Sequence, residues 1–384
     1  MGKPLQFLGP AIELLAGQVS ILPATGGAVV ELQHPDVDEI EDRLVNRDAG
    51  EITDFLETPE PSSSNLYRST PPIFRAENHL FRFFIDGSLR TYFLATALEA
   101  DRSFPIQLAQ IGAAVMRRDG NGSICCTSRK NRILLLLPTQ QMGLSDTVWQ
   151  EMKRLRTSDG SFEPVDIVEK TSLTPRDATQ DDLRDRGGGI ARHRMHQLEI
   201  GLIKSTDGMR DAASWLILDG AVKLDEFISA PYLIGVAKSF RKDPQFRFGR
   251  GRTTQRRDIT SILAGLEFAH RTVAFSSHGG KVAFWYVRLR PQAQLDYPLM
   301  GVVKVELPRP DGSAVPTELA DLLSRALVAE RNVTPYGQDP RWHCHLYPIY
   351  LAEQSIKNQF YSQEVLLGAV RWPRPSQPQS GGLP

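Results

Sequence analysis

Two Asp-Gly steps, each at the end of an apolar run, are the clearest candidates for chemistry in this chain. The first, Asp86-Gly87, follows the run Phe83–Ile85, and the second, Asp219-Gly220, follows the run Trp215–Leu218. Glu199 lies between them, in a stretch whose apolar residues recur at helical spacing. We expect apolar strands to deliver Asp86 and Asp219 to the edge of a sheet. Carboxylates gathered there are suitable ligands for Mn²⁺ or Mg²⁺.

Three such carboxylates indicate phosphodiester chemistry. Cleavage needs an activated water and relief of charge on the leaving oxygen, and two cations roughly 4 Å apart provide both. We expect Asp86 to bridge the ions, with Glu199 and Asp219 completing their ligation. A single Asp-Gly step is most often a turn, but a carboxylate on the core-facing side of a helix is costly unless it is paired or binds a metal.

Two further residues could act on a phosphate group. Lys238 follows the apolar run Tyr232–Ala237, where it either holds a phosphate or is an ordinary lysine at a strand end. Tyr347, at an expected helix start, either donates a hydrogen bond near a phosphate or packs at the boundary of the core. Residues 343–345 read His-Cys-His, but adjacent side chains rarely converge on one ion, so a zinc site is not expected there.

The segment 240–257 holds the strongest local concentration of positive charge, with Asp243 as its one acidic residue. Phe246 and Phe248 interleave with its arginines. Cations for phosphates and aromatic faces for bases are what single-stranded nucleic acid binding requires. A mobile basic loop without a ligand is the alternative. The residues expected to contact nucleic acid are Arg241, Lys242, Arg247, Phe248, Arg250, Arg252, Arg256 and Arg257.

The elements that must position these residues mix apolar strands with amphipathic helices, which predicts an α/β fold with a mixed sheet flanked by helices. Residues 80–86 and 90–97 are expected to form a hairpin around Ser88. Further strands are expected at 106–116, 133–137, 215–218, 232–237, 282–289 and 301–307, a turn at 119–122, a loop at 157–188, and helices at 190–204, 318–331 and 348–367.

Composition changes along the chain predict three parts. Residues 1–75 form an acidic accessory segment that ends in a linker at 59–64, residues 76–372 form the main domain, and residues 373–384 form a disordered Pro/Gly/Ser tail. The acidic run within 31–60 is either a solvated face or a surface that shields a basic channel or docks a partner.

Overall composition excludes several classes of protein. The 45 basic and 45 acidic residues balance, so no global field attracts nucleic acid. Cys125 and Cys126 are adjacent and Cys344 is distant, so neither a zinc framework nor a disulfide framework is expected, and a reducing compartment is indicated. Glu13 interrupts the apolar N-terminus, and the longest aliphatic run, at 133–137, is too short to cross a bilayer. We expect a cytoplasmic protein with no membrane contact.

The order of these segments resembles the NurA nuclease family, which has an RNase H-like fold of the Piwi type. The resemblance covers roughly residues 78–365 and depends on six short motifs in a fixed order. They are FFIDGSLR at 83–90, QLEIGL at 197–202, LILDGAV at 216–222, IGVAKS at 234–239, GVVKVELP at 301–308 and LYPIYLAEQSI at 346–356.

The resemblance implies a manganese-dependent nuclease that acts on DNA ends, in end resection, repair or phage defence. It also implies a ring-like homodimer docked on a hexameric HerA-type DNA-translocating ATPase. Position by position, the family's metal-binding acids match Asp86, Glu199 and Asp219, and its lysine and tyrosine match Lys238 and Tyr347.

One position departs from the family. Ser355 stands eight residues after Tyr347, where the family often has a histidine, and His343 or His345 could take its place. This departure leaves open a non-catalytic DNA clamp within a translocase complex. A third interpretation is an actin-like phosphotransferase, which is disfavoured because the chain has no GxxxxGK loop.

Overall fold

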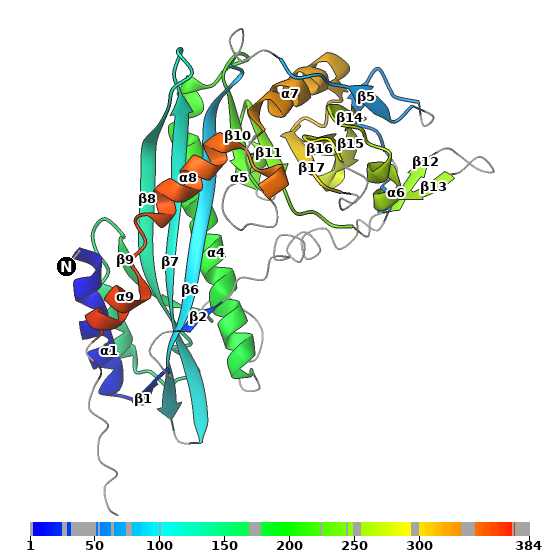
Figure 1. Ribbon diagram of the computed structural model, residues 1–384. Coiled ribbons are helices and arrows are strands. Elements are labelled where there is room, and N and C mark those ends of the chain that lie inside the picture. Colours follow the sequence, from blue (N-terminus) through cyan, green and yellow to red (C-terminus); the bar gives the residue numbers. More distant parts are fainter. Residues whose placement is uncertain are drawn as a thin grey trace, which may run out of the picture.

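One large mixed sheet organises the protein and gives it an α/β fold (Figure 1). The computed structural model describes residues 3–24, 29–31, 51–52, 54–62, 65–73, 79–99, 101–168, 178–222, 225–242, 245–248, 255–292, 299–331, 342–370 and 372. The sheet has 13 strands, ten of which form the path β5-β14-β16-β17-β11-β10-β6-β7-β8-β9. In that order they are Tyr67–Ser69, His270–Thr272, Val282–Arg288, Val302–Pro308, Leu233–Ala237, Trp215–Asp219, Phe81–Glu99, Arg102–Arg118, Ile124–Leu137 and Phe162–Asp166.

Shorter strands complete the β-structure. The strands β1 (Ser20–Pro23) and β2 (Val29–Glu31) pair with β6, and β15 (Phe275–Ser277) pairs with β16. Two small sheets are separate from the large one. They are β13-β12-β3 (Gln255–Asp258, Gln245–Phe248, Glu51–Ile52) and β18-β4 (Val315–Pro316, Glu57–Thr58).

Helices cover both faces of the large sheet. The helices are α1 (Leu8–Ala16), α3 (Asp146–Arg154), α4 (Gln180–Ser205), α5 (Asp225–Ile228), α6 (Ile259–Ala264), α7 (Thr317–Glu330), α8 (Tyr347–Lys357) and α9 (Gln363–Ala369). Figure 1 shows α8 crossing the front of β6, β7 and β8, with α4 behind them.

The strand β6 is the longest element of the sheet and differs from the predicted hairpin. It runs through 19 residues without a turn at Ser88. Ser88 pairs with Gly112, and the antiparallel ladder to β7 continues on both sides of it. The hairpin prediction was wrong because a turn at this point would sacrifice the ladder bonds of a strand that is apolar on both sides of the Asp-Gly step. The chain instead reverses between Glu99 and Arg102.

Alternation along β6 directs its side chains to two separate cores. Phe83 and Ile85 pack in the core that contains Leu198 of α4, whereas Phe84 packs in the core that contains Ile349 of α8. The two helices therefore bury opposite faces of the same strand. Asp86 follows Phe84 by two residues and points to the α8 face.

The helix α4 begins ten residues earlier than predicted. Thr179 and Asp182 form a reciprocal capping box that starts it at Gln180. The predicted loop at 157–188 is thus wrong at both β9 and the first part of α4, whereas residues 169–177 lie outside the described residues. Within the helix, packing favours glycine at Gly187, where an added Cβ would lie 2.1 Å from Oε1 of Gln107, whereas a Cβ at Gly188 or Gly189 would meet open space.

Most other predicted elements are confirmed. Strands occur at each of the remaining predicted places, with β8 starting earlier, at Ile124. Residues 119–122 form the expected turn, in which the Asp119 carboxylate accepts hydrogen bonds from the amides of Asn121 and Ser123. The predicted helix at 348–367 is wrong as one element. It divides into α8 and α9 because the hydroxyl of Ser362 caps a new helix start.

The described residues before position 75 are built into the fold. The strand β5 pairs with β14, and β4 carries Glu57, which is 3% exposed. Both carboxylate oxygens of Glu57 accept hydrogen bonds of 2.9 Å from the guanidinium of Arg271, which is fully buried. The acidic residues 32–50 and the predicted tail at 373–384 lie outside the described residues.

Among the described residues, no helix is long and apolar enough to cross a membrane.

Replacement of Glu57 should measurably destabilise the protein. The change Glu57→Gln leaves the buried Arg271 with the carboxylate of Asp321, 2.6 Å from its Nε, as its remaining anionic partner among the described residues, so we expect the free energy of unfolding to fall by about 2 kcal/mol. Burial raises the pKa of Glu57, but hydrogen bonds and charge from Arg271 outweigh it and hold the pKa below 4.5. The stabilisation is therefore present above about pH 4.5 and is lost as the pH falls below it.

Denaturant unfolding at pH 7 and pH 4 measures both effects. The exposed Glu60→Gln serves as the matched control. If Glu57→Gln and Glu60→Gln unfold at the same denaturant concentration, the buried pair does not have this role.

Candidate active site

Asp86 and Asp219 lie next to each other at a gap in the sheet beside β6. The strands β10 and β6 run parallel, with Leu218 opposite Ile85, and β10 ends one residue later at Asp219. On that side of β6, the next partner within the described residues is β2, which begins to pair at Thr91. Residues 86–90 therefore line an interruption in the sheet. Asp86 lies at its start, beside Asp219.

Lys238 closes one side of this gap. It directly follows β11, the parallel neighbour of β10, and its Nζ lies 2.8 Å from Oδ2 of Asp219. The two side chains are largely buried, at 11% and 20% exposure. Parallel strands that end together thus bring the predicted lysine to the predicted carboxylate.

A fourth carboxylate, which sequence analysis did not identify, joins the group from α8. Burial raises the pKa of Glu353, but its 2.5 Å bond to Lys357 and the charges of Lys238 and His345 outweigh that effect and lower the pKa. Its neighbour Ala352 is fully buried, so Glu353 lies at the edge of the apolar stripe of the helix. The same signal identified Glu199 and could have identified this residue.

Glu199 approaches β6 from the opposite face. It is 2% exposed on α4, and its Oε2 lies 2.6 Å from Nδ1 of His196. Its Oε1 is so close to Gly87 that an added Cβ there would be 2.7 Å away. Gly87 and Asp86 are adjacent in the strand, so their Cα substituents point to opposite faces. The structure therefore brings together Asp86, Asp219, Lys238 and Glu353, with Glu199 across the strand.

Burial, followed by neighbouring negative charge, sets the electrostatics of Asp86. Burial and then the charge of Asp219 raise its pKa well above the usual value of 3.8, while Lys238 opposes this rise. Glu353 and Glu199 contribute further upward shifts. Asp86 is therefore a buried carboxyl group with more negative than positive charge around it.

These residues fit a divalent cation in donor chemistry and in charge. They offer carboxylate oxygens, which hard cations prefer, and their negative charge exceeds what Lys238 offsets. Within the described residues, no three His, Cys, Asp or Glu side chains are already placed to hold one metal ion. Lys238 engages Oδ2 of Asp219, so an ion that used this oxygen would compete with the lysine.

The loop after Asp219 is fixed by a buried ion pair. The amide of Val222 donates a 2.6 Å hydrogen bond to Oε2 of Glu306, whose Oε1 lies 2.5 Å from Nζ of Lys304. Gly220 adopts a φ of 109°, which favours glycine and lets the chain turn directly after the carboxylate. This conformation explains the glycine of the second Asp-Gly step. The glycine of the first step, Gly87, has a different reason, because a side chain there would clash with Glu199.

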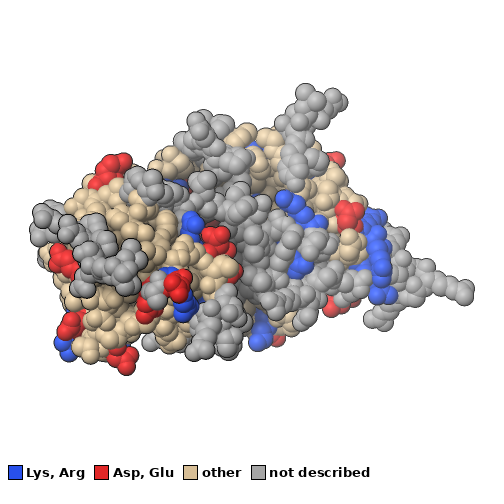
Figure 2. Space-filling model, turned by 90° about the horizontal axis from the view of Figure 1, so that it is seen from below, with Lys and Arg blue, Asp and Glu red and all other residues tan. Residues whose placement is uncertain are grey.

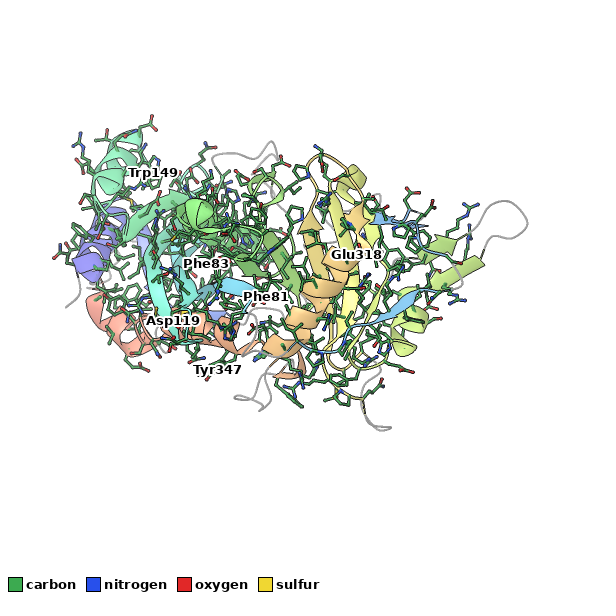
Figure 3. All side chains as sticks on the ribbon, turned by 90° about the horizontal axis from the view of Figure 1, so that it is seen from above. Phe81, Phe83, Asp119, Trp149, Glu318 and Tyr347 are labelled. Atoms are coloured by element: carbon green, nitrogen blue, oxygen red, sulfur yellow. The ribbon has the colours of Figure 1, made fainter. Side chains whose placement is uncertain are left out.

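Residues near the start of α8 have different roles. Tyr347 is 39% exposed, and Figure 3 shows it at the edge of the molecule, whereas Phe81 and Phe83 lie inside. His343 accepts a 2.9 Å hydrogen bond from the amide of Gly301 through Nδ1, which ties it to the start of β17. His345 is the histidine whose charge acts on Glu353.

Ser355 does not lie among the carboxylates' partners. Its hydroxyl and its backbone carbonyl each lie 3.1 Å from Nη1 of Arg129 on β8, and the hydroxyl also contacts Sγ of Cys126. The serine therefore contacts β8, two strands away from β6, and its contacts are to Arg129 and Cys126 rather than to Asp86.

The basic segment forms a hairpin of β12 and β13. Arg247 and Arg256 lie directly opposite each other, and both are exposed. Arg257 is also exposed, but Phe246 is fully buried against Phe275, with ring centroids 4.7 Å apart. The idea that Phe246 interleaves with the arginines to stack on bases is therefore wrong, because alternation turns it into the core.

Other parts of the predicted interface are less fully defined. Arg241 is partly exposed and Lys242 exposed before β12, whereas Arg250, Arg252 and the side chain of Phe248 lie outside the described residues. In Figure 2, basic side chains gather at the right-hand end of the molecule, where β12 and β13 lie in Figure 1.

Comparison of the chain with protein-family models and with curated proteins finds no match. The interpretation of the site therefore depends on its own geometry.

Removal of the Asp219 charge should lower the pKa of Asp86. In Asp219→Asn, the like charge disappears and Lys238 is released toward Asp86, so both changes favour the ionised form. We expect the carboxyl carbon of Asp86, followed by NMR in metal-free protein, to titrate at a lower pH than in the wild type. The exposed Asp211→Asn is the control. An unchanged titration of Asp86 in Asp219→Asn would show that the two groups are not neighbours.

Proposed function

We propose that this protein is a metal-dependent DNA nuclease with an RNase H-like domain. The observation that carries the proposal is the convergence of Asp86, Asp219, Glu353 and Lys238 at the gap beside β6. The strand order β8-β7-β6-β10-β11, with three antiparallel strands followed by two parallel ones, supports an RNase H-like interpretation. Hydrolysis of phosphodiester bonds is the reaction for which this set of side chains is best suited.

Each side chain has a role set by its place. Asp86, Asp219 and Glu353 would hold Mn²⁺ or Mg²⁺, and Glu199 would complete the set through the open edge beside Gly87. Bound there, the metal would supply Lewis acidity and an activated water. Lys238, once released from Asp219, would neutralise charge on the scissile phosphate. His196 fixes the carboxylate of Glu199 through their 2.6 Å contact.

The basic hairpin would guide the DNA strand. Arg247 and Arg256 lie directly opposite each other in the hairpin and are both exposed, so they present two cations side by side. A phosphate backbone is a suitable partner for such a pair of cations. We also propose, from the family resemblance, a cytoplasmic homodimer that works with a hexameric HerA-type ATPase on DNA ends.

A non-catalytic DNA clamp is the second candidate. It is favoured by Ser355, whose contacts to Arg129 and Cys126 leave the carboxylate group without the family's histidine. The clamp would bind DNA and the ATPase but would not cut DNA with any metal.

Cleavage of end-labelled DNA tests the nuclease directly. We expect the wild type to cut single-stranded or double-stranded DNA with Mn²⁺ or Mg²⁺ and not with EDTA. Asp86→Asn should lose cleavage to background and still bind DNA, because its shape is unchanged and its metal ligand is gone. Asp146→Asn, at an exposed position on α3, should cut normally.

The outcomes separate the two candidates. A variant Asp86→Asn that still cuts would disprove the assigned site. Wild-type protein that binds DNA but does not cut it, alone or with the ATPase, would instead support the non-catalytic clamp.

The hairpin should carry part of the DNA affinity. In the double variant Arg247→Gln/Arg256→Gln, two phosphate contacts are lost, so the slope of log affinity against log salt should decrease in magnitude by about 2. Cleavage at saturating DNA should be unchanged because the carboxylates are intact. Lys153→Gln/Arg154→Gln on α3 removes the same charge at exposed positions and is the control. Equal salt slopes for the two double variants would exclude the hairpin from the DNA path.

A further inference from the structure

Three arginines from different parts of the chain surround one buried glutamate. Glu163 lies on β9 and is 7% exposed. Nη1 of Arg132, on β8, lies 3.9 Å from its Oε2. Nη1 of Arg156, between α3 and β9, and Nη2 of Arg194, on α4, each lie 3.8 Å from its Oε1. We refer to Arg132, Arg156 and Arg194 as the arginine cluster.

The arginine cluster lies on the side of the sheet that α4 covers. Leu134 pairs with Glu163, and Arg132 precedes Leu134 by two residues, so these side chains share one face. Arg194 of α4 approaches Glu163 from the same side. The cluster is therefore separate from Asp86, which points to the α8 face.

The cluster carries more positive charge than its surroundings offset. Among the described residues, Glu163 is the one acidic side chain within 4 Å of the three guanidinium groups. Asp159 of the adjacent turn makes local contacts, because its Oδ1 accepts hydrogen bonds from the amide and the hydroxyl of Ser161. About two positive charges therefore remain in excess at the cluster.

The donors of the cluster are largely uncommitted. All three distances to Glu163 are longer than a hydrogen bond, so the carboxylate attracts the arginines by charge alone. Within the described part of the chain, Arg194 has one further contact, 3.4 Å from Nη1 to Oε1 of Gln197. The side chains of Arg132, Arg156 and Arg194 are 26%, 54% and 33% exposed, so a ligand can reach them from solvent.

A rigid turn beside the cluster limits the movement of two arginines. Gly160 has a φ of 68°, and an added Cβ there would lie 3.5 Å from Cζ of Arg132, so the turn packs against this guanidinium. The amide of Phe162 donates a 3.0 Å hydrogen bond to Oγ1 of Thr157, and the amide of Thr157 donates to the carbonyl of Phe162. Arg156 directly precedes this turn, so its backbone is fixed at the edge of the cluster.

We propose that the arginine cluster binds a phosphomonoester group. Arg156 and Arg194 approach the same oxygen, so their nitrogens are at most about 8 Å apart, a span that one tetrahedral oxyanion bridges with two ordinary hydrogen bonds. Guanidinium groups also match phosphate oxygens in bidentate geometry. A phosphomonoester carries roughly −1.5 to −2 charges at pH 7, which matches the excess positive charge of the cluster.

The group has two chemical sources. A free phosphorylated small molecule and the 5′-phosphate at the end of a nucleic acid strand both present it. A phosphodiester within a strand carries a single negative charge and leaves part of the excess unmatched. The inference does not depend on the nuclease activity, because the cluster includes none of the carboxylates around Asp86.

Calorimetry on the full-length protein, at pH 8 in EDTA, tests the proposal with inorganic phosphate as the probe. We expect a Kd of about 1 mM or lower. Arg156→Gln and Arg194→Gln should each weaken binding by about tenfold, because each removes a charge-assisted hydrogen bond. Arg154→Gln removes an exposed charge two residues from Arg156 and should bind like the wild type.

Glu163→Gln separates a binding cluster from a purely structural ion pair. Loss of the competing carboxylate should strengthen phosphate binding by about tenfold. The variant should unfold at a lower temperature than the wild type without phosphate, and phosphate should raise its unfolding temperature more than it raises that of the wild type. A glutamate with a purely structural role would instead give a variant that phosphate does not rescue, which would contradict the proposal.

Competition between phosphate and a trinucleotide distinguishes the two sources. Displacement by the 5′-phosphorylated form but not by the 5′-hydroxyl form would identify a strand end, and phosphate binding that neither form displaces would identify a free small molecule. Either result supports the proposal. Absence of binding at about 10 mM phosphate, or equal competition by the 5′-hydroxyl form, would overturn it whether or not the protein cuts DNA.

Discussion

The burial of the Asp86 carboxyl group beside other carboxylates is the constraint on which the rest of the site depends. A carboxylate inside a sheet, beside a second carboxylate, is unfavourable unless cations or hydrogen bonds compensate it. Among the described residues, Lys238, which contacts Asp219, opposes part of this unfavourable charge. The remaining crowding of carboxyl groups is the reason for proposing a divalent cation as their partner.

The length of β6 and the two helices that cover it place the Asp86 carboxyl group at this site. The strand β6 extends beyond the end of β10, so Asp86 is placed in a continuous ladder with β7 and at an opening toward Asp219. The helices α4 and α8 cover the opposite faces of β6, and each contributes one acid, Glu199 and Glu353. Ion pairs buried elsewhere, such as Glu306 with Lys304, fix the loops that would otherwise move the carboxylates.

Sequence alone predicts the sheet class and the meeting of Asp86, Asp219 and Lys238, because apolar strands that end together must present their next residues at the same edge. It fails where tertiary pairing decides. The Asp-Gly step at 86–87 resembles a turn, but β7 keeps it in a strand. Glu353 lies beside the buried Ala352 at the edge of a helical apolar stripe, the same pattern that identifies Glu199, so the sequence does carry a signal for it. The inward orientation of Phe246 depends on the formation of β12, which the sequence does not predict. The sequence alone does not show that Glu199 lies against the face of β6 opposite Asp86, because that position depends on how α4 packs on the sheet.

A titration of Mn²⁺ followed by electron paramagnetic resonance tests the central claim most directly. The account predicts that the metal-free wild type binds Mn²⁺ and that Asp219→Ala weakens binding by at least about tenfold, because it removes a ligand that lies next to Asp86. The unfolding temperatures of the wild type and of Asp219→Ala, measured in parallel, show whether the variant is folded. Equal Mn²⁺ binding by both proteins would contradict the claim that the carboxylates beside β6 form a metal site.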